Sequence, residues 1–582
     1  ALKVAAAAAA AALLSFAAPS PVLAGKADDT LNIAWAGELP TLDRYFNVLR
    51  EGELVARMVF DSLLTVDPQT FDYKPLLASS YRFADNRTIE FELRRDVRFH
   101  DGQPFDADDV VYTLNLMADP ATRVLSRQNV DWIEKVEKID SHKVRLIMKA
   151  PTPLALEYLA GPLLIYPHGY YSKVGSQGMG LRPVGTGPYK VTAFDPGKRI
   201  VFEANRDYFD GSPKGRPAIG RVVQRTIPDQ NTQIAELLSG GVDWIWNVPN
   251  DQAAKLAAMP NVVVQNAQTM RFGYLAFDAS NRTGHAAAVN DARVRQAIAH
   301  SIDRKTIVKR LVRGASEVID AVCFPTQFGC TQQVATYDYD PAKAKALLAE
   351  AGYPNGRDAR SGEPLVVNLD TTSGGIGSKS HIDWLSKQLQ KIDVQLVVRS
   401  TDYNRFQEKV RKGAAQLFFF GWNADYPDPE NFLFLLYGPQ GKVKTSGENA
   451  ANYASPEYDR LFEAMKTMDN GPERQAGIDR MLAILRQDSP WIWGFHPKDY
   501  VLSHAWLSNR KPTKVGRNTL KYQRVDPELR QRLRREWNQP VLWPFLIVTT
   551  AITVVILPAF LGYRRREKAP AKRGAMSGTA KG

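Results

Sequence analysis

The residues with the clearest chemical potential lie between Phe418 and Pro429, where the chain reads FFFGWNADYPDP. Two carboxylates in this segment, Asp425 and Asp428, are the residue type that glycoside hydrolysis uses as an acid–base pair. Proline residues lie close to both aspartates, however, and aspartate is common in turns that contain proline. The residues alone therefore favour a turn that Asp425 caps, with Asp428 and Glu430 as solvated turn residues, over a catalytic pair.

Other signals of catalysis or metal binding are absent from the sequence. None of the motifs HExxH, GxSxG and GxxxxGK[ST] occurs, and His100–Gly102 is typical of a turn between a strand and a helix. Cys323 and Cys330 are the only cysteines. They predict a small disulfide loop in an oxidising compartment, with two free buried thiols as the alternative. No further Cys or His lies close enough to complete a metal site. We expect no enzyme activity, no metal and no cofactor.

Length and charge indicate a globular protein of several lobes without a nucleic-acid surface. The chain has 582 residues, more than one hydrophobic core usually serves, so two or three lobes are expected. Its net charge of +13 is concentrated at one end, because residues 524–582 carry 12 Lys and Arg against 4 Asp and Glu. Since the rest of the chain has no strong basic surplus, we expect no nucleic-acid partner.

Apolar segments near both ends predict export and membrane attachment. Residues 1–24, in which Lys3 precedes an Ala-rich run, are typical of a signal peptide. Val541–Tyr563 contains 23 residues without a charge; as a helix this segment is about 35 Å long and can span a membrane. A linker is expected at 526–540, and the basic residues after the span favour a cytoplasmic tail at 564–582. A buried core helix is the alternative for the apolar segment.

The elements that must position these residues are expected to be alternating strands and helices. Thr88–Leu93 alternates apolar and polar residues as a half-buried strand does, and Asp106 is a candidate helix N-cap. Asp340 and Pro341 open another helix, which Gly352 ends. Further strands are expected at Leu31–Trp35, Val394–Arg399 and Leu417–Gly421, and further helices at Glu53–Leu64 and Asp479–Arg486. This mixture predicts α/β lobes.

Five regions of the chain, in order, resemble the peptide-binding class of the bacterial extracellular solute-binding proteins, family 5. Each is weak alone, but together their order and spacing match over about residues 30–520. The C-terminal membrane span departs from the soluble or lipid-anchored forms common in that family. The five regions are Thr88–Asn115; Gly185–Tyr189 with Asn205–Phe209; Asp291–Val308; Gly421–Leu433; and Asn452–Tyr458 with the helix after it.

The resemblance implies a periplasmic-binding-protein-like fold: a clamp of two lobes and three structural domains that closes over its ligand about a hinge. Lobe I, which is the discontinuous domain I, is expected to comprise residues 26–70, 187–285 and 505–525. Domain II is expected at 71–186. Lobe II, or domain III, is expected at 286–504.

The resemblance also implies where the ligand binds. Asp425 matches the family's carboxylate for the protonated α-amine of a peptide. Gly421 permits close backbone approach, and together with Asn423 it lies where an extended peptide could add as a strand through main-chain hydrogen bonds. Trp422 either stacks against the ligand or packs in the cleft wall.

A second segment, Tyr45, Phe46 and Asn47, lies where the family often lends backbone atoms to the ligand. A short peptide also needs a cation for its C-terminal carboxylate. The sequence does not choose among the candidates for that cation, which are Arg399, Arg405 and Lys379.

The implied function is that of an extracytoplasmic substrate-binding protein, which binds oligopeptides or dipeptides and delivers them to an ABC importer. Its partners are then the permease and ATPase subunits, and its monomeric binding domain lies in the periplasm, anchored in the inner membrane by the C-terminal helix. The same fold could instead bind a nickel chelate, haem, an opine or an oligosaccharide. A membrane-tethered ligand sensor is a further alternative, although a tail of about 19 residues leaves no room for a signalling domain.

Overall fold

The computed structural model divides the chain into two compact units, Ala1–Asp526 and Pro527–Gly582. The expected signal peptide, the Cys323–Cys330 pair and the end of the basic tail lie outside the described residues. The structure describes residues 29–67, 70, 72–246, 248, 250–268, 271–280, 284–307, 316–318, 337–372, 379–509, 523–537 and 543–568.

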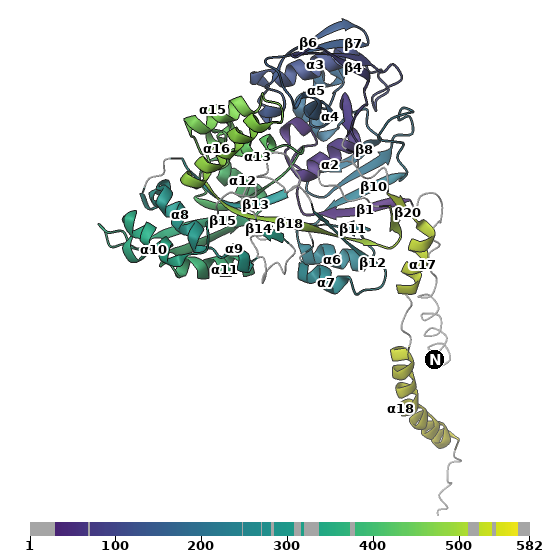
Figure 1. Ribbon diagram of the computed structural model, residues 1–582. Helices are drawn as coiled ribbons and strands as arrows, with labels where there is room; N and C mark the ends of the chain where they lie inside the picture. Colours follow the sequence, from purple (N-terminus) through teal and green to yellow (C-terminus); the bar gives the residue numbers. More distant parts are fainter. Residues whose placement is uncertain are drawn as a thin grey trace, which may run out of the picture. The chain divides into compact units, whose positions relative to one another are not determined.

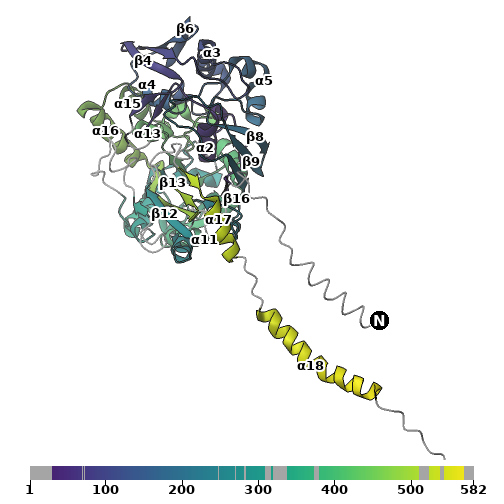
Figure 2. The same ribbon diagram turned by 90° about the vertical axis from the view of Figure 1, so that its right-hand side faces the viewer.

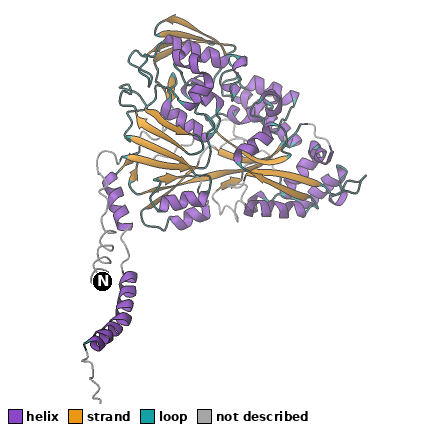
Figure 3. Cartoon of the chain, turned by 180° about the vertical axis from the view of Figure 1, so that it is seen from behind, coloured by secondary structure: helices purple, strands orange, loops and turns teal. Residues whose placement is uncertain are grey.

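A 12-stranded mixed sheet runs through the first unit, with helices packed on it, and confirms the predicted α/β class (Figure 3). Its strands follow the order β16-β15-β17-β13-β18-β11-β1-β10-β9-β8, and β12 and β14 also pair with β18. The strands are β1 (Thr30–Trp35), β8 (Tyr189–Asp195), β9 (Arg199–Ala204), β10 (Arg221–Thr226), β11 (Trp244–Ile245), β12 (Val262–Gln268), β13 (Arg271–Phe277), β14 (Ser316–Val318), β15 (Val366–Thr372), β16 (Gln395–Thr401), β17 (Leu417–Asn423) and β18 (Trp491–His504).

The long strand β18 belongs to both halves of this sheet. Its first residues pair with β13, where Trp491 lies opposite Ala276, and its last residues pair with β12 and β11, where Ser503 lies opposite Val263 and Trp244. The chain also passes from one half to the other between the consecutive strands β12 and β13. We therefore propose that the chain crosses from lobe I to lobe II between β12 and β13 and that β18 extends from lobe II back into lobe I. Both crossings precede the boundaries expected at residues 285 and 504.

The half of the sheet that carries β13, β15 and β17 is covered on both faces. Alternation along β13 buries Phe272 and Tyr274 in one core and Leu275 and Phe277 in the other. Residues of α12 (Tyr403–Arg411), α13 (Glu430–Leu433), α15 (Pro456–Met465) and α16 (Pro472–Asp488) complete the first core. Residues of α8 (Ala292–Ser301), α10 (Pro341–Glu350) and α11 (Lys379–Gln390) complete the second.

A separate four-stranded antiparallel sheet forms within residues 71–186, with the order β4-β5-β7-β6 (Figure 1). Its strand β5 begins at Thr88 and ends at Leu93, as predicted. Helix α3 (Ala107–Ala118) packs on β6, and Figure 2 shows α3 beside α5. Asp106 caps α3, because its side chain accepts a hydrogen bond from the Asp108 N–H at 2.8 Å. The other elements here are β4 (Ala78–Asp85), β6 (Ile133–Asp140), β7 (Lys143–Met148), α4 (Ala155–Ala160) and α5 (His168–Leu181).

The helix expected at Glu53–Leu64 is shorter than predicted. Helix α2 spans Arg50–Val59, the backbone of Phe60 is extended, and Leu64 begins a short strand. The apolar run continues past the helix because the residues after Val59 are buried in turns and strands. The remaining elements of the first unit are β2 (Leu64–Val66), β3 (Tyr73–Pro75), α6 (Gln230–Leu238), α7 (Asn250–Leu256), α9 (Arg304–Thr306), α14 (Lys442–Thr445), β19 (Leu507–Ser508) and β20 (Arg524–Val525).

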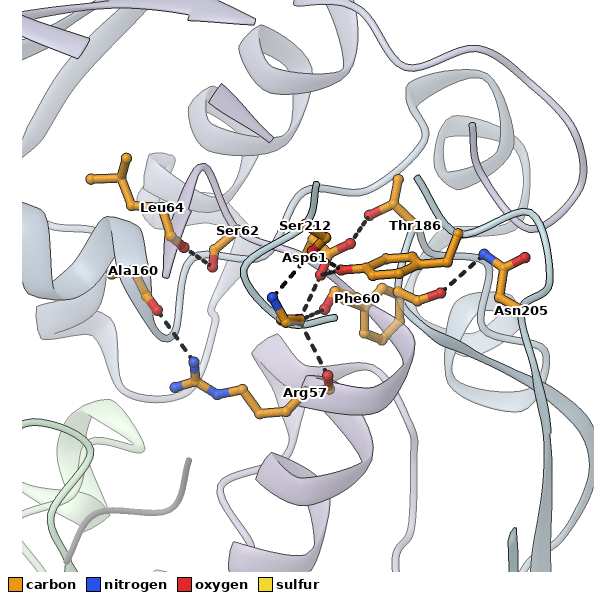
Figure 4. Close-up of polar contacts among 12 residues, drawn as sticks. Arg57, Phe60, Asp61, Ser62, Leu64, Ala160, Thr186, Asn205 and Ser212 are labelled. Carbon is orange, nitrogen blue, oxygen red and sulfur yellow. Dashed lines mark hydrogen bonds and ion pairs between the residues drawn. The ribbon is translucent and has the colours of Figure 1, made fainter. Parts of the chain in front are cut away.

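A buried ion pair joins the end of α2 to the loop between β9 and β10 (Figure 4). The Lys214 Nζ atom lies 2.6 Å from Asp61 Oδ1, and the two side chains are 7% and 0% exposed. The Thr186 hydroxyl donates to Asp61 Oδ2 at 3.0 Å, and the Tyr208 hydroxyl donates to Asp61 Oδ1 at 3.3 Å. A Cβ at Gly187 would lie 2.5 Å from the Val59 carbonyl carbon, so only glycine allows this approach. The segments Gly185–Tyr189 and Asn205–Phe209 thus have a structural role.

The second unit contains α17 (Pro527–Trp537) and α18 (Trp543–Glu567). Helix α18 has 25 residues and is long and apolar enough to cross a membrane, judged by length and composition. Its apolar side chains, from Trp543 to Tyr563, are largely exposed within this unit.

Candidate functional site

The segment that contains Asp425 leaves the sheet at the end of β17. Gly421 lies opposite Gly273 on β13, and Asn423 lies opposite Arg271. A Cβ at Gly421 would lie 2.9 Å from the Phe272 carbonyl oxygen, so a larger residue would push these two strands apart. A turn follows β17 and leads into α13, which places Asp425 just beyond the edge of the paired strands.

Trp422 packs in the protein core. It is 8% exposed, and its ring meets the Phe434 ring edge-on with centroids 5.3 Å apart. Its Nε1 atom donates a hydrogen bond to Asn431 Oδ1 at 3.0 Å. The same oxygen accepts from the backbone N–H of Asp425 at 3.0 Å. Trp422 and Asn431 together therefore hold the turn that positions Asp425.

The Asp425 carboxylate lies between elements of the two lobes. Its side chain is 18% exposed, and Arg44 Nη2 lies 3.9 Å from its Oδ1. Desolvation raises the pKa of Asp425 to about 6, and the positive charge of Arg44 opposes that rise. Arg44 belongs to the segment between β1 and α2, in the part of the chain expected to form lobe I, whereas Asp425 follows β17, in the part expected to form lobe II.

Arg44 is held by groups from its own lobe. Its Nε donates to Glu53 Oε2 at 2.6 Å, and its Nη1 donates to the Asn47 carbonyl oxygen at 2.6 Å. Arg57 Nε donates to the second oxygen of Glu53, also at 2.6 Å. Although desolvation acts in the opposite sense, Arg57 and Arg44 lower the pKa of Glu53 to about 2. Glu53 is therefore an anion that fixes two guanidinium groups.

The segment of Tyr45, Phe46 and Asn47 lies beside this arginine. The Tyr45 hydroxyl donates to the Leu164 carbonyl oxygen at 2.8 Å, and Asn47 Nδ2 donates to the Thr41 carbonyl oxygen at 2.7 Å. The first contact joins Tyr45 to residues 71–186, the expected domain II, and the second lies within the expected lobe I, while Phe46 is half-buried. A ligand role for this segment stays a prediction.

The expectation that Asp428 and Glu430 are solvated turn residues is wrong. Asp428 is 6% exposed and accepts two hydrogen bonds from Arg474, at 2.7 and 2.8 Å. Glu430 is 2% exposed, and the Tyr426 hydroxyl donates to it. The local sequence did not predict the burial of Asp428, because its partner, Arg474, lies 46 positions further along the chain.

Glu430 also takes part in a contact with residues 71–186, the expected domain II. Tyr158, on α4, donates its hydroxyl to Glu430 Oε2 at 3.2 Å, and its ring meets the Tyr426 ring edge-on at 5.3 Å. Desolvation raises the pKa of Glu430 to about 7, and the Tyr426 hydrogen bond opposes that rise. Sequence reasoning did not identify Arg44, Glu53, Tyr158 or Glu430 as site residues, since Arg44 and Tyr158 meet Asp425 and Glu430 only through contacts between residues distant in the sequence.

Tyr403, the first residue of α12, is 42% exposed. Desolvation raises its pKa, and the charge of Glu51, on α2, adds to that rise. Gly421 is also exposed.

The three cations suggested for a ligand carboxylate all have partners outside this cluster. Arg399 pairs with Asp370, and Arg405 lies 3.4 Å from Asp402. Lys379 lies 2.6 Å from Asp383 and is 87% exposed. None of these contacts involves Asp425 or Arg44, so the structure offers no support for choosing any of the three.

One group of possible metal ligands, Asp106, Asp109 and His168, occurs among the described residues. Its atoms already make structural contacts. Asp109 accepts from the Asp106 N–H at 3.0 Å and from the backbone N–H of His168 at 2.8 Å, and its Oδ1 also lies 2.8 Å from His168 Nδ1. The arrangement is a capped helix start, and it requires no ion.

Comparison with known proteins agrees with this geometry. The model of the family "Bacterial extracellular solute-binding proteins, family 5 Middle" matches residues 72–444. Heme-binding protein A of Haemophilus influenzae is 27% identical over 479 residues, which cover 78% of this chain and 84% of that protein. Glutathione-binding protein GsiB of Shigella dysenteriae is 26% identical over 470 residues, which cover 79% and 87%.

Solved structures share the fold. The periplasmic binding protein DppA from Helicobacter pylori, associated with an ABC transporter and solved in complex with the peptide STSA, superposes with a TM-score of 0.77. The two are 24% identical, and the match covers 85% of this chain and 98% of that one. A two-lobed α/β clamp whose lobes meet around Asp425, matched by a family model over most of its length, identifies the chain as a member of family 5 of the bacterial extracellular solute-binding proteins, the binding components of ABC importers.

Proposed function

We propose that the chain binds a peptide-like solute with a protonated amine between its lobes and delivers it to an ABC importer without reacting with it. The observation that carries this proposal is Asp425, a desolvated carboxylate at the contact between the lobes. A carboxylate in such a place favours a cationic partner. Gly421 and Asn423 would lie beside the extended ligand, with Trp422 behind them in the core.

The ligands of similar proteins support this proposal. The relative from Shigella dysenteriae is named for glutathione, and the structure from Helicobacter pylori holds a peptide. The relative from Haemophilus influenzae is named for haem, which makes haem the second candidate. Native mass spectrometry of the protein as purified distinguishes the two, because a retained peptide and a retained haem differ in mass. Haem alone would contradict the peptide proposal.

Substitution of Asp425 by Asn tests the amine partner. We expect free-amine peptides to bind at least about tenfold more weakly, because the buried ammonium then lacks its counterion. N-acetylated peptides, which have no ammonium, should bind weakly to both proteins. Isothermal titration calorimetry measures these affinities. Equal affinity of the two proteins for a free-amine peptide would contradict the assignment of Asp425.

We further propose that the binding unit is exported by the segment 1–24 and acts in the periplasm as a monomer. Helix α18 then anchors it in the inner membrane, and the basic residues from Arg564 onward remain cytoplasmic. The permease and ATPase subunits are the expected partners. Co-purification of the tethered protein with an importer permease checks this arrangement.

A further inference from the structure

The contact between Arg44 and Asp425 is too loose for a direct hydrogen bond. The Arg44 Nη2 and Asp425 Oδ1 atoms lie 3.9 Å apart, beyond the usual 2.7–3.2 Å range. Arg44 cannot easily move closer, because Glu53 holds its Nε and the Asn47 carbonyl oxygen holds its Nη1. The guanidinium therefore presents its Nη2 edge toward Asp425 without closing on it.

The charges around Asp425 are already balanced without a ligand. Arg44 and Arg57 are cations, and Glu53 and Asp425 are their anions, so the formal sum is zero. A ligand that brings only an ammonium group adds an uncompensated positive charge to a desolvated site, which is costly. A ligand head that brings an ammonium and a carboxylate together adds no net charge.

The side chains of Asp425 and Arg44 match the two charged groups of such a head. An ammonium can pair with the Asp425 carboxylate while a carboxylate on the same carbon accepts from Arg44 Nη2, as arginine readily allows. Asn431 is fully buried beside Asp425, and its side-chain hydrogen bond lowers the pKa of Asp425, so this amide orients the carboxylate from behind.

We propose that Arg44 and Asp425 together recognise a head group that carries an ammonium and a carboxylate on one carbon. A free α-amino acid has this head, and so does the γ-glutamyl end of a peptide. The N-terminus of an ordinary peptide lacks it, because its α-carboxyl is an amide. Arg44 is thus a specificity-determining residue. This inference rests on the proposed function and narrows its ligand class.

Two isomeric dipeptides test the inference on the unaltered protein. γ-Glu-Ala and α-Glu-Ala have the same composition and charge, but only the γ isomer carries its ammonium and a carboxylate on one carbon. We expect calorimetry to show that γ-Glu-Ala binds at least tenfold more tightly. Free L-glutamate, titrated in parallel, carries the same head without the rest of a peptide, and it should bind more tightly than α-Glu-Ala does.

Two matched variants test the role of Arg44. Arg44→Lys keeps the charge but loses the planar donor set, and it should reduce the preference for the γ isomer to less than threefold. Arg57→Lys alters the other arginine that binds Glu53 and should preserve the preference. Melting temperatures of both variants identify any general loss of folding, in which case the isomer comparison on the unaltered protein decides.

The outcomes separate this inference from the function on which it rests. Equal binding of the two dipeptides, or tighter binding of α-Glu-Ala, overturns the head-group inference and leaves the peptide proposal standing. Binding of neither dipeptide nor glutamate, with an unrelated solute retained in native mass spectrometry, overturns both. A preference for the γ isomer that persists in Arg44→Lys removes Arg44 from the recognition.

Discussion

The pKa values of the carboxyl groups at the lobe interface depend on the surroundings of each group in the fold rather than on its neighbours in the sequence. Asp425 and Glu430 both lose solvent when the lobes meet, and desolvation raises their pKa values to about 6 and about 7. Glu53 is equally enclosed, but two arginines lower its pKa to about 2. One interface therefore holds a permanent anion and two carboxyls that change charge near neutral pH.

This difference predicts a pH dependence of ligand binding. An ammonium group pairs with the charged form of Asp425, and without ligand that form is lost as the pH falls through about 6. The affinity for an amine ligand should therefore be highest near pH 7 and fall by up to about tenfold per unit below pH 6, and it should also begin to fall near pH 8, where a peptide α-amine loses its proton. Calorimetry from pH 4.5 to 8 measures the profile.

The Asp425→Asn variant is the control for this profile, since it has no carboxyl to titrate at that position. Its affinity should be lower and nearly independent of pH between 5 and 7. A profile with the same midpoint in both proteins would attribute the titration to another group, of which Glu430 is the nearest in pKa.

The sequence could indicate a site residue only where that residue lies in a recognisable continuous motif. Asp425 could be proposed because its motif, Gly421–Leu433, lies in one continuous stretch. Arg44 was not, because its role depends on a contact with a residue 381 positions away in the numbering. Asp428 was misassigned for the same reason: a turn aspartate and a buried ion-pair partner of Arg474 have the same local sequence.

Among the helices and strands, sequence patterns predicted those that depend on residues close together in the chain. Strand β5 follows from alternation, and α3 follows from its Asp106 cap. Strand β18 did not follow, because it changes partners along its length from β13 to β12. Such a strand carries no single pattern of buried and exposed faces, since each half packs in a different lobe.

The buried pair Lys214–Asp61 shows how a long-range contact fastens elements that are separated in the chain. Desolvation lowers the pKa of Lys214, and Asp61 opposes that shift at a distance of 2.6 Å. Replacing Lys214 with Met leaves Asp61 charged and unpaired in the core. We expect a loss of about 3–5 kcal/mol in the free energy of unfolding, measured by urea denaturation.

A second substitution checks the cause of that loss. Adding Asp61→Asn to Lys214→Met removes the unpaired charge and keeps one acceptor oxygen for Thr186 or Tyr208, so the double variant should be more stable than Lys214→Met alone. If the single variant unfolds at the same urea concentration as the unaltered protein, the pair does not fasten these elements.

At the scale of the whole molecule, binding and attachment are assigned to different units. Every residue of the proposed site, from Arg44 to Asp425, lies within Ala1–Asp526, and the apolar helix α18 lies within Pro527–Gly582. The family model likewise ends at residue 444, well before α18. Tethering raises the local concentration of a binding unit near its importer without adding contacts to the ligand.

Truncation after Asp526 separates the two roles. The truncated protein should remain in the soluble fraction after export, whereas the full chain should stay with membranes through an alkaline wash, because about 23 apolar residues hold it in the bilayer. Ligand affinity in calorimetry should agree within about twofold between the two, since α18 contributes no site residue, while uptake of the ligand by cells should fall with the loss of local concentration. A full chain that the alkaline wash releases would contradict the anchor, and a truncated chain that no longer binds would show that the second unit takes part in the site.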